Sequence, residues 1–137
     1  MAYEESLRSI TLNADDTLAV YTGVPGALGS PSPHYGNQYR FVKLTGARQA
    51  GLATAAADTI IGVMQSKPQV EGQEATVSIR GISNVMSGGA LSPGDFVTVD
   101  GSGRAVSTET KADALGVVID STATAENHLA SVLLWIN

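Results

Sequence analysis

The sequence contains no cysteine and only two histidines among its 137 residues. Without cysteine the chain has neither a disulfide framework nor thiolate chemistry. A metal site needs three or four convergent ligands. His34 lies in a proline-rich segment and His128 in a polar turn, and neither has a second ligand at suitable spacing. We therefore predict that the protein binds no metal and no cofactor.

Charged residues are also scarce. They make up 15% of the chain, against about 25% in an ordinary soluble domain. The net charge of -5 argues against a nucleic-acid partner, because binding nucleic acid requires a basic face. A small chain with so little charge is expected to have part of its surface covered by a partner or by copies of itself.

Long apolar runs are missing too. No stretch approaches the ~20 apolar residues that a membrane-spanning helix needs. The N-terminal sequence MAYEESLRS is acidic and has no apolar core, so it lacks the pattern of a signal peptide. We expect a soluble protein made in a cytoplasm, with no membrane partner.

Motifs that carry catalysis are not found. No serine lies in a GxSxG elbow. The segment DGSGR at residues 100–104 has the glycines of a phosphate loop, but it joins two predicted strands and opens no helix, so it is predicted to be a hairpin turn. Asp58 and Asp113 precede strands, where aspartate is a typical turn residue. We predict that the protein is not an enzyme.

The most informative feature present is a stretch that occurs twice, at residues 42–79 and 97–134. Val97 follows Val42 by 55 residues, and Asp113 follows Asp58 at the same spacing. The Gly–Val step at residues 62–63 recurs at 116–117, one residue closer. Two copies are too few for a solenoid, and they predict one compact domain built from two related halves.

Short alternating segments separated by Gly- and Pro-rich turns indicate an all-β fold, a small barrel or sandwich. The predicted strands are residues 9–12, 17–22, 39–44, 51–54, 60–65, 75–80, 96–99, 105–107, 115–119 and 129–136. Gly81 is expected to end a strand, and residues 82–93 to connect the halves. We predict a single β domain over residues 39–137, after an N-terminal arm, hairpin and loop over residues 1–38.

Residues 23–37 hold three of the five prolines and four glycines, a composition typical of an extended loop. Such a loop is either a flexible linker or an arm that lies on a partner's surface. The nearby aromatic residues His34, Tyr35 and Tyr39 would suit the second role.

The last strands of the two copies differ on one face. Both copies keep small or branched apolar residues on the inner face. On the other face Ser78 and Arg80 are replaced by Leu133 and Trp135. A strand that is apolar on both faces is expected to be buried on both. Either the N-terminal hairpin covers this face, or Leu133 and Trp135 pack on another subunit, where aromatic residues are favoured.

The second half also resembles a known family. After Gly81 a small-residue turn leads to PGDFV at residues 93–97, then to the hairpin DGSGRA at 100–105, the Gly–Val step and a final apolar strand at 132–134. This order resembles the capsid decoration (cement) proteins of tailed bacteriophages over about residues 40–137. Residues 1–38 depart from the short start expected of that family.

The resemblance implies a small, typically trimeric β protein on the outer surface of an assembled phage head, made in the host cytoplasm. It would tie neighbouring major capsid subunits together against the pressure of packaged DNA. The implied partners are the major capsid protein and further copies of the chain. The alternative is a non-catalytic ligand- or glycan-binding module on a virion surface, with Tyr21, Tyr35 and Tyr39 as candidate aromatic residues.

Two sets of contact residues are expected on this basis. Capsid contacts are expected from the N-terminal segment and the loop, at Tyr3, Leu7, Arg8, Pro25, Leu28, His34, Tyr35 and Tyr39. Oligomer contacts are expected from the connector and the last strand, at Val85, Met86, Leu91, Leu133 and Trp135.

Overall fold

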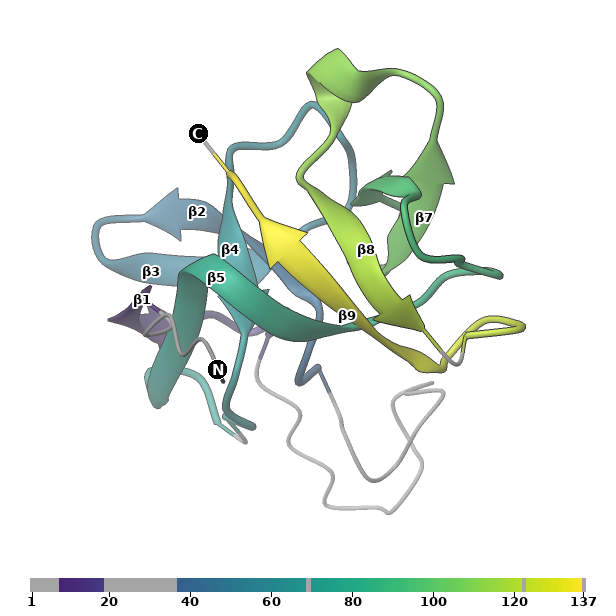
Figure 1. The fold of residues 1–137 in the computed structure, drawn as a ribbon. Helices are drawn as coiled ribbons and strands as arrows, with labels where there is room; N and C mark the ends of the chain where they lie inside the picture. The colour runs from purple at the N-terminus through teal and green to yellow at the C-terminus, as the bar shows by residue number, and fades with distance from the viewer. Residues whose placement is uncertain (1–7, 19–36, 69, 122, 137) are drawn as a thin grey trace.

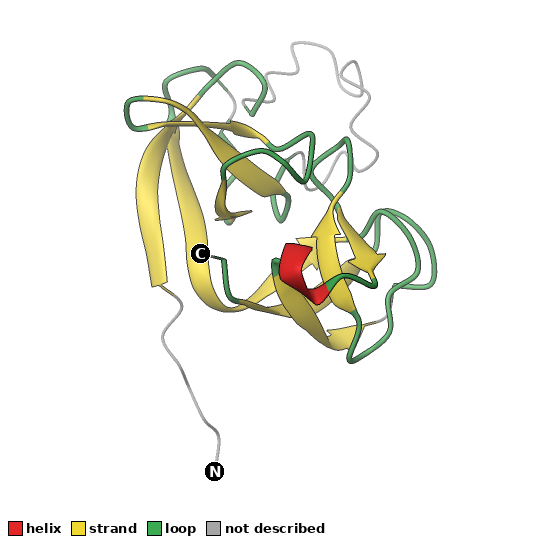
Figure 2. Ribbon diagram, turned by 90° about the horizontal axis from the view of Figure 1, so that it is seen from above, coloured by secondary structure: helices red, strands yellow, loops and turns green. Residues whose placement is uncertain are grey.

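The computed structural model describes residues 8–18, 37–68, 70–121 and 123–136, which form an all-β fold (Figure 1). The short 3-10 turn η1 (Lys111–Asp113) interrupts the strands and is drawn as the red segment in Figure 2. Within the described ranges no helix is long and apolar enough to cross a membrane. The prediction of an all-β fold is confirmed.

The first part of the chain forms a closed barrel of five strands. Their bounds are β1 (Arg8–Ala14), β2 (Phe41–Gly46), β3 (Gln49–Leu52), β4 (Ile60–Met64) and β5 (Glu74–Met86). The order β1-β3-β2-β4-β5 returns to β1, because β1 also pairs with β5. The β1–β3 pair is parallel and the other pairs are antiparallel. Closure into a ring leaves few unpaired strand edges.

The barrel interior is filled by small and branched apolar side chains. Alternate residues of each strand point inward, as the two-residue period of a strand requires. The fully buried members are Ala14, Leu18, Val42, Ala50, Met64, Ala75 and Val77. The inward face predicted for residues 75–79 is thus present, with Ile79 partly buried.

Four more strands extend the sheet from the second part of β5. They are β6 (Phe96–Val99), β7 (Ala105–Thr108), β8 (Gly116–Ser121) and β9 (Leu129–Leu134), in the order β5-β9-β8-β6-β7. Figure 1 shows β9 lying between β5 and β8. An isolated parallel bridge joins Ser87 to Ala105. A second core contains residues of both parts, among them Phe41, Val63, Val97, Val118 and Val132.

The expectation that Gly81 ends a strand is wrong. β5 continues through Gly81 to Met86, and Gly81 has a φ of 105°. Glycine adopts this conformation without the steric penalty of a Cβ atom. The strand pairs with β1 up to Arg80 and with β9 from Gly81 onward. Residues 82–86 are therefore a strand shared between the two parts and not a connector.

The predicted strand at residues 9–12 is confirmed as part of β1, but its partners differ from those of a local hairpin. β1 pairs with β5 and β3, both distant in sequence. Residues 16–18 form a turn, and the rest of the predicted second hairpin strand lies outside the described residues. Part of the segment before residue 38 therefore belongs to the barrel.

The Gly–Val step has a steric cause. A Cβ atom on Gly62 would meet the carbonyl oxygen of Ser78, and one on Gly116 would meet the carbonyl oxygen of Leu133. Because both obstacles are backbone atoms, neither can move aside cheaply. Glycine is needed at both positions so that the neighbouring strands can approach.

Candidate contact surface

A row of apolar side chains crosses the outward side of the sheet formed by the second part of β5 with β9, β8, β6 and β7. Ile82 of β5 lies opposite Leu133 of β9, Leu133 opposite Val117 of β8, and Val117 opposite Phe96 of β6. Residues directly opposite on adjacent strands share one face and lie side by side. Together with Trp135 we call these residues the outer apolar face.

Aromatic contacts fix one end of this face. The rings of Phe96 and Trp135 meet edge to face with centroids 5.9 Å apart. The Nζ atom of Lys111 lies 5.7 Å from the Phe96 centroid. The Nε1–H of Trp135 donates to the carbonyl oxygen of Ala114 at 3.1 Å. The indole is thus held in place with its polar atom satisfied, which leaves its ring as apolar surface.

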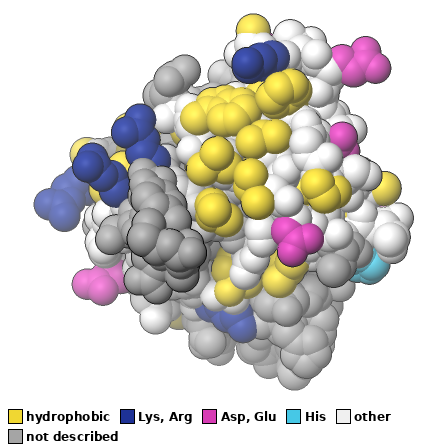
Figure 3. Space-filling view, in the orientation of Figure 1, with side chains coloured by type: hydrophobic (Ala, Val, Ile, Leu, Met, Phe, Trp, Pro, Cys, Tyr) yellow, Lys and Arg dark blue, Asp and Glu magenta, His cyan; other side chains and the backbone are white. Residues whose placement is uncertain are grey.

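The outer apolar face is open to solvent. Ile82 is 58% exposed, Leu133, Val117, Phe96 and Trp135 are partly exposed, and neighbouring Ile119 is also exposed. Apolar side chains gather over β9, β8 and β5 in Figure 3. Contiguous apolar surface of this kind marks an interaction site in soluble proteins. The described part of the N-terminal segment, β1, pairs along β5 before Gly81 and does not cover this face.

The residues expected at the oligomer interface divide into two groups. Leu133 and Trp135 lie on the outer apolar face. Val85, Met86 and Leu91 are buried within the chain instead. Val85 and Leu91 belong to the core that both parts share, and Met86 at the end of β5 is fully buried as well. These three residues therefore present no surface to a second subunit.

Of the residues expected to contact the capsid, two lie within the described ranges. Arg8 is exposed at the start of β1, opposite Arg80. Tyr39 is partly buried, has a positive φ of 67°, and accepts a hydrogen bond at its carbonyl oxygen from the Met86 N–H at 2.7 Å. The others lie outside the described residues: Tyr3, Leu7, Pro25, Leu28, His34 and Tyr35.

Sequence reasoning did not select Ile82, Phe96 and Val117 for this surface. The signal for Phe96 was the alternation in FVTV, which turns Val97 and Val99 inward and Phe96 outward. The signal for Val117 was the Gly–Val step next to the last strand. Ile82 could not be assigned a face while its segment was interpreted as a connector.

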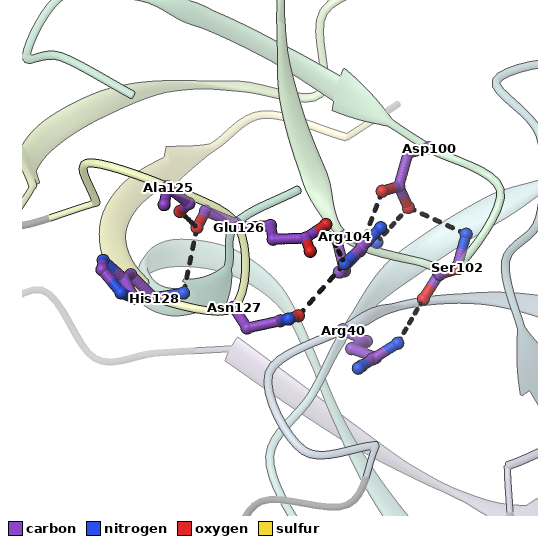
Figure 4. A network of polar contacts seen from close by, with 9 residues as sticks. Arg40, Asp100, Ser102, Arg104, Ala125, Glu126, Asn127 and His128 are labelled. Atoms are coloured by element: carbon purple, nitrogen blue, oxygen red, sulfur yellow. Dashed lines mark hydrogen bonds and ion pairs between the residues drawn. The ribbon is translucent and has the colours of Figure 1, made fainter. Parts of the chain in front are cut away.

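A polar network occupies the junction of the two parts (Figure 4). Asp100 accepts the backbone N–H groups of Ser102 and Arg104 at 2.8 and 2.9 Å and forms an ion pair with the Arg104 Nε at 2.9 Å. Arg104 also donates to Glu126 and Asn127. These contacts confirm that residues 100–104 form a turn, between β6 and β7, and not a phosphate loop.

Arg40 is a buried cation in the same region. Its Nη1 donates to the carbonyl oxygen of Ser102 at 2.8 Å, while its Nε and Nη2 have no hydrogen-bond partner. Burial lowers the pKa of Arg40, the nearby charge of Arg104 lowers it further, and Asp100 opposes the shift. The guanidinium ties β2 to the β6–β7 turn.

Asp58 has a structural role, as its position before a strand predicted. Its Oδ2 accepts the N–H groups of Thr54 and Ala55 at 2.9 and 3.0 Å and pairs with the Lys43 Nζ at 3.4 Å. The hydrogen bond from Thr54 is the main cause that lowers the pKa of Asp58, with those from Ala55 and Lys43 adding to it. Among the described residues, no cluster of three or more His, Cys, Asp or Glu side chains is placed to hold a metal ion.

Comparisons with known proteins place these observations in a wider group. A family model described as phage cement protein matches residues 37–134. Among solved structures, the chain is similar to the N base of the head fiber protein gp8.5 of bacteriophage phi29. The TM-score is 0.62 at 15% sequence identity, over 96% of this chain and 97% of that one. Comparison with curated proteins gave no match.

Proposed function

The chain belongs to the phage cement protein family, and from that premise we propose that it stabilises an assembled phage head by bridging neighbouring major capsid subunits. As a member of the family it is a structural, non-enzymatic component of the phage head surface. The observation that carries the proposal is the outer apolar face, which no described part of the chain covers. A protein that works only by contact needs such a surface.

The contacts do not have to be strong one by one. Burying apolar surface contributes roughly 25 cal/mol per Å², and binding also has to offset the ordering of the partners. Many copies held on one lattice gain by avidity, so each contact can be modest. The low charge of the chain fits a surface made largely for contact.

For the capsid side, we assign the contact to the N-terminal segment and the loop before β2. The proposed residues are Tyr3, Leu7, Arg8, Pro25, Leu28, His34, Tyr35 and Tyr39. Arg8 is exposed at the start of β1, opposite Arg80 of β5. A protein that bridges subunits needs more than one contact surface, and this arrangement supplies two.

For self-association, we propose a homotrimer in which Leu133 and Trp135 take part in the subunit contact. Their position on the outer apolar face supports this assignment. Changing Trp135 to Ser should lower the molar mass measured by light scattering. An assembly of unchanged mass would argue against Trp135 as a contact residue.

The stabilising role is tested on heads. Heads assembled with and without the protein are heated or subjected to osmotic shock, and DNA release is followed by a dye. We expect heads without the protein to release DNA at lower temperature. Equal resistance of the two preparations would refute the bridging role, whatever the oligomeric state.

We also propose that the chain consists of two copies of one five-stranded unit. The pairs Phe41–Val63 and Val42–Leu52 of the first unit correspond to Phe96–Val117 and Val97–Ser107 of the second. The offsets are those of the repeat in the sequence. In this arrangement the second part of β5 takes the place in the second unit that β1 has in the first.

Three matching pairs of backbone hydrogen bonds support that last equivalence. Ala14 N–H donates to Gln73, and Ser87 N–H donates to His128, which lies 55 residues after Gln73. Gly72 N–H donates to Ala14, and Asn127 N–H to Ser87. Asp15 and Gly88 donate to Ala50 and Ala105 in the same manner. The parallel pair Ala14–Ala50 thus corresponds to the bridge Ser87–Ala105.

The glycan-binding alternative has no specific observation in its favour. Tyr21 and Tyr35 lie outside the described residues, and Tyr39 is partly buried.

A further inference from the structure

The two units expose different surfaces, and we propose that they fit each other between copies. The outer apolar face of one copy receives the end of β2 and the turn that follows it in a second copy, residues 44–48. This head-to-tail contact repeats between copies the contact that the two units make within one chain. The inference rests on the duplication and self-association proposed above and names the surfaces that meet.

The contact within one chain serves as the template. There the β6–β7 turn of the second unit sits on β2 of the first. Phe41 N–H donates to the Gly103 carbonyl oxygen at 2.7 Å, and Arg40 donates to that of Ser102 at 2.8 Å. The outward residues of the first unit, Phe41, Val63 and Ser78, are 0% exposed. A face of this unit is therefore normally buried under another unit.

The second unit has the equivalent face without the cover. Phe96, Val117 and Leu133 stand at the positions of Phe41, Val63 and Ser78 and are partly exposed. Leu133 replaces a serine, so the uncovered face is more apolar than the covered one. Ile82 extends it at 58% exposure. Such a face is suited to a further unit, and a second copy of the chain supplies one.

The matching surface on the first unit is also exposed. Residues 44–48 are all exposed, including Leu44 at 48%. Its equivalent in the second unit, Val99, is 5% exposed and lies in the core shared with Phe41. Leu44 is thus an exposed apolar residue on the segment that would insert, and Ile82 is an exposed apolar residue on the face that would receive it.

Size and charge at the contact are complementary. Arg48 stands at the position of Gly103, and both have a positive φ, 55° and 75°. A Cβ atom at Gly103 would meet the Leu52 side chain most closely, and the carbonyl oxygens of Phe41 and Ala53 at 3.1 and 3.3 Å. On the receiving unit the smaller Ser107 corresponds to Leu52, which removes the closest of these contacts. Asp95 and Glu109 occupy the positions of Arg40 and Thr54 on the receiving edge. They supply carboxylates for Arg48.

A head-to-tail contact uses two different surfaces, so it closes into a ring when the rotation between copies allows it. Three copies related in this way form the proposed homotrimer. In this ring each copy binds one neighbour with its outer apolar face and the other neighbour with its β2–β3 turn. A head-to-tail contact and a symmetric face-to-face contact therefore predict different results when variants of the two surfaces are mixed.

The test uses two variants, Ile82→Asp on the face and Leu44→Asp on the turn. Molar mass is measured by light scattering against concentration. Each variant alone should dissociate, with at least about a tenfold weaker association than the wild type. An equimolar mixture of the two should form a dimer, because the intact face of one variant still receives the intact turn of the other.

Matched controls keep the outcome interpretable. Val70→Asp places the same charge at an exposed apolar position that belongs to neither surface and should leave the mass unchanged. Thermal melting shows whether each variant is folded. Arg48 is exposed, so Arg48→Glu serves as a second turn variant. Mixing it with a Glu109→Arg protein should restore the association, because the two charges are exchanged.

Three results would overturn the inference: a monomeric wild type at high concentration, a Leu44→Asp protein of unchanged mass, or no dimer in the mixture. None of these depends on the capsid. Failure of the wild type to protect heads would instead refute the bridging function, with the mass in solution unaffected.

Discussion

Two faces of the molecule carry similar residues in the same strand register and differ in what covers them. Phe41 and Val63 of the first unit are fully buried, while Phe96 and Val117, paired in the same way, remain partly exposed. The difference does not arise from local sequence or strand pairing. It arises because the second unit packs on the first, and no described segment packs on the second.

The comparison has a functional consequence. A covered apolar face stabilises the fold, and the same kind of face left open is available for assembly. In a phage cement protein, whose work is contact, the open copy of the face is where we expect the partner. Variants at equivalent positions should therefore behave differently.

The largest difference is expected for the two phenylalanines. Phe41→Ala should lower the free energy of unfolding by about 3–5 kcal/mol, because it leaves a cavity between the units. Phe96→Ala should cost only about 1–2 kcal/mol, from partial burial and the lost contact with Trp135. Urea unfolding of dilute, monomeric protein measures both. Equal losses would mean that the two faces are covered alike.

A smaller effect, equal in both units, is expected at the glycines of the Gly–Val steps. Gly62→Ala and Gly116→Ala each push a methyl group against a backbone carbonyl oxygen. Each should destabilise the protein by about 1–3 kcal/mol, the usual range for overpacking. Gly89→Ala, where a Cβ meets no atom, is the control. A tolerated change at one site alone would contradict the proposed equivalence of the units.

The turn that joins the units should be more sensitive than its counterpart. Asp100→Ala removes two backbone hydrogen bonds and the ion pair with Arg104. We expect a loss of about 1–3 kcal/mol in unfolding experiments. The equivalent Thr45→Ala, on the exposed turn, should change the stability of the monomer little. A larger loss at Thr45 would show that its turn is not free in the single copy.

The smallest effect concerns Asp58 and pH. Its pKa is lowered in the folded protein by the hydrogen bond from Thr54 and by further donors. A lowered folded pKa gives stability that is present above the unfolded pKa, near 4, and is lost as pH falls through the folded pKa. The urea midpoints of the wild type and Asp58→Asn should differ at pH 7 and converge as the pH falls through the folded pKa of Asp58.

Asp113→Asn is the matched control, since Asp113 lies at the equivalent place in the 3-10 turn and accepts no such pair of backbone bonds. Its urea midpoint should stay close to that of the wild type across the same range. A difference between wild type and Asp58→Asn that persisted in acid would contradict the role given to the carboxylate.

Much of the fold could be predicted from alternation and turn residues. The strands at residues 60–65, 96–99 and 129–136 agree with β4, β6 and β9 within two residues. The continuation of β5 could not be predicted, because the polar Ser83 occupies an inward position in residues 82–86. In the structure its hydroxyl accepts a hydrogen bond from Gln65 at 2.8 Å, so its burial is tolerated. Gln65 directly follows β4, so the local pattern of residues 82–86 does not reveal this hydrogen bond.

Barrel closure was equally beyond local patterns. The parallel β1–β3 pair joins residues more than thirty positions apart, across a loop that the sequence marks only as irregular. Pairing of this kind depends on where the remaining strands bring the two segments. The same holds for Val85, which points into the shared core because β5 is one continuous strand, and for the burial of Met86 at its end.

The sequence by itself determined that the protein is all-β, and it predicted the repeat and an apolar outer face at Leu133 and Trp135 that we propose as a contact. These properties follow from residue type and spacing, which act locally. Only the tertiary structure decided which of the two equivalent faces is buried, because burial depends on what packs against a residue. Phe41 and Phe96 illustrate this. The residue is the same and its paired neighbour is valine in both cases, but packing buries Phe41 and leaves Phe96 partly exposed.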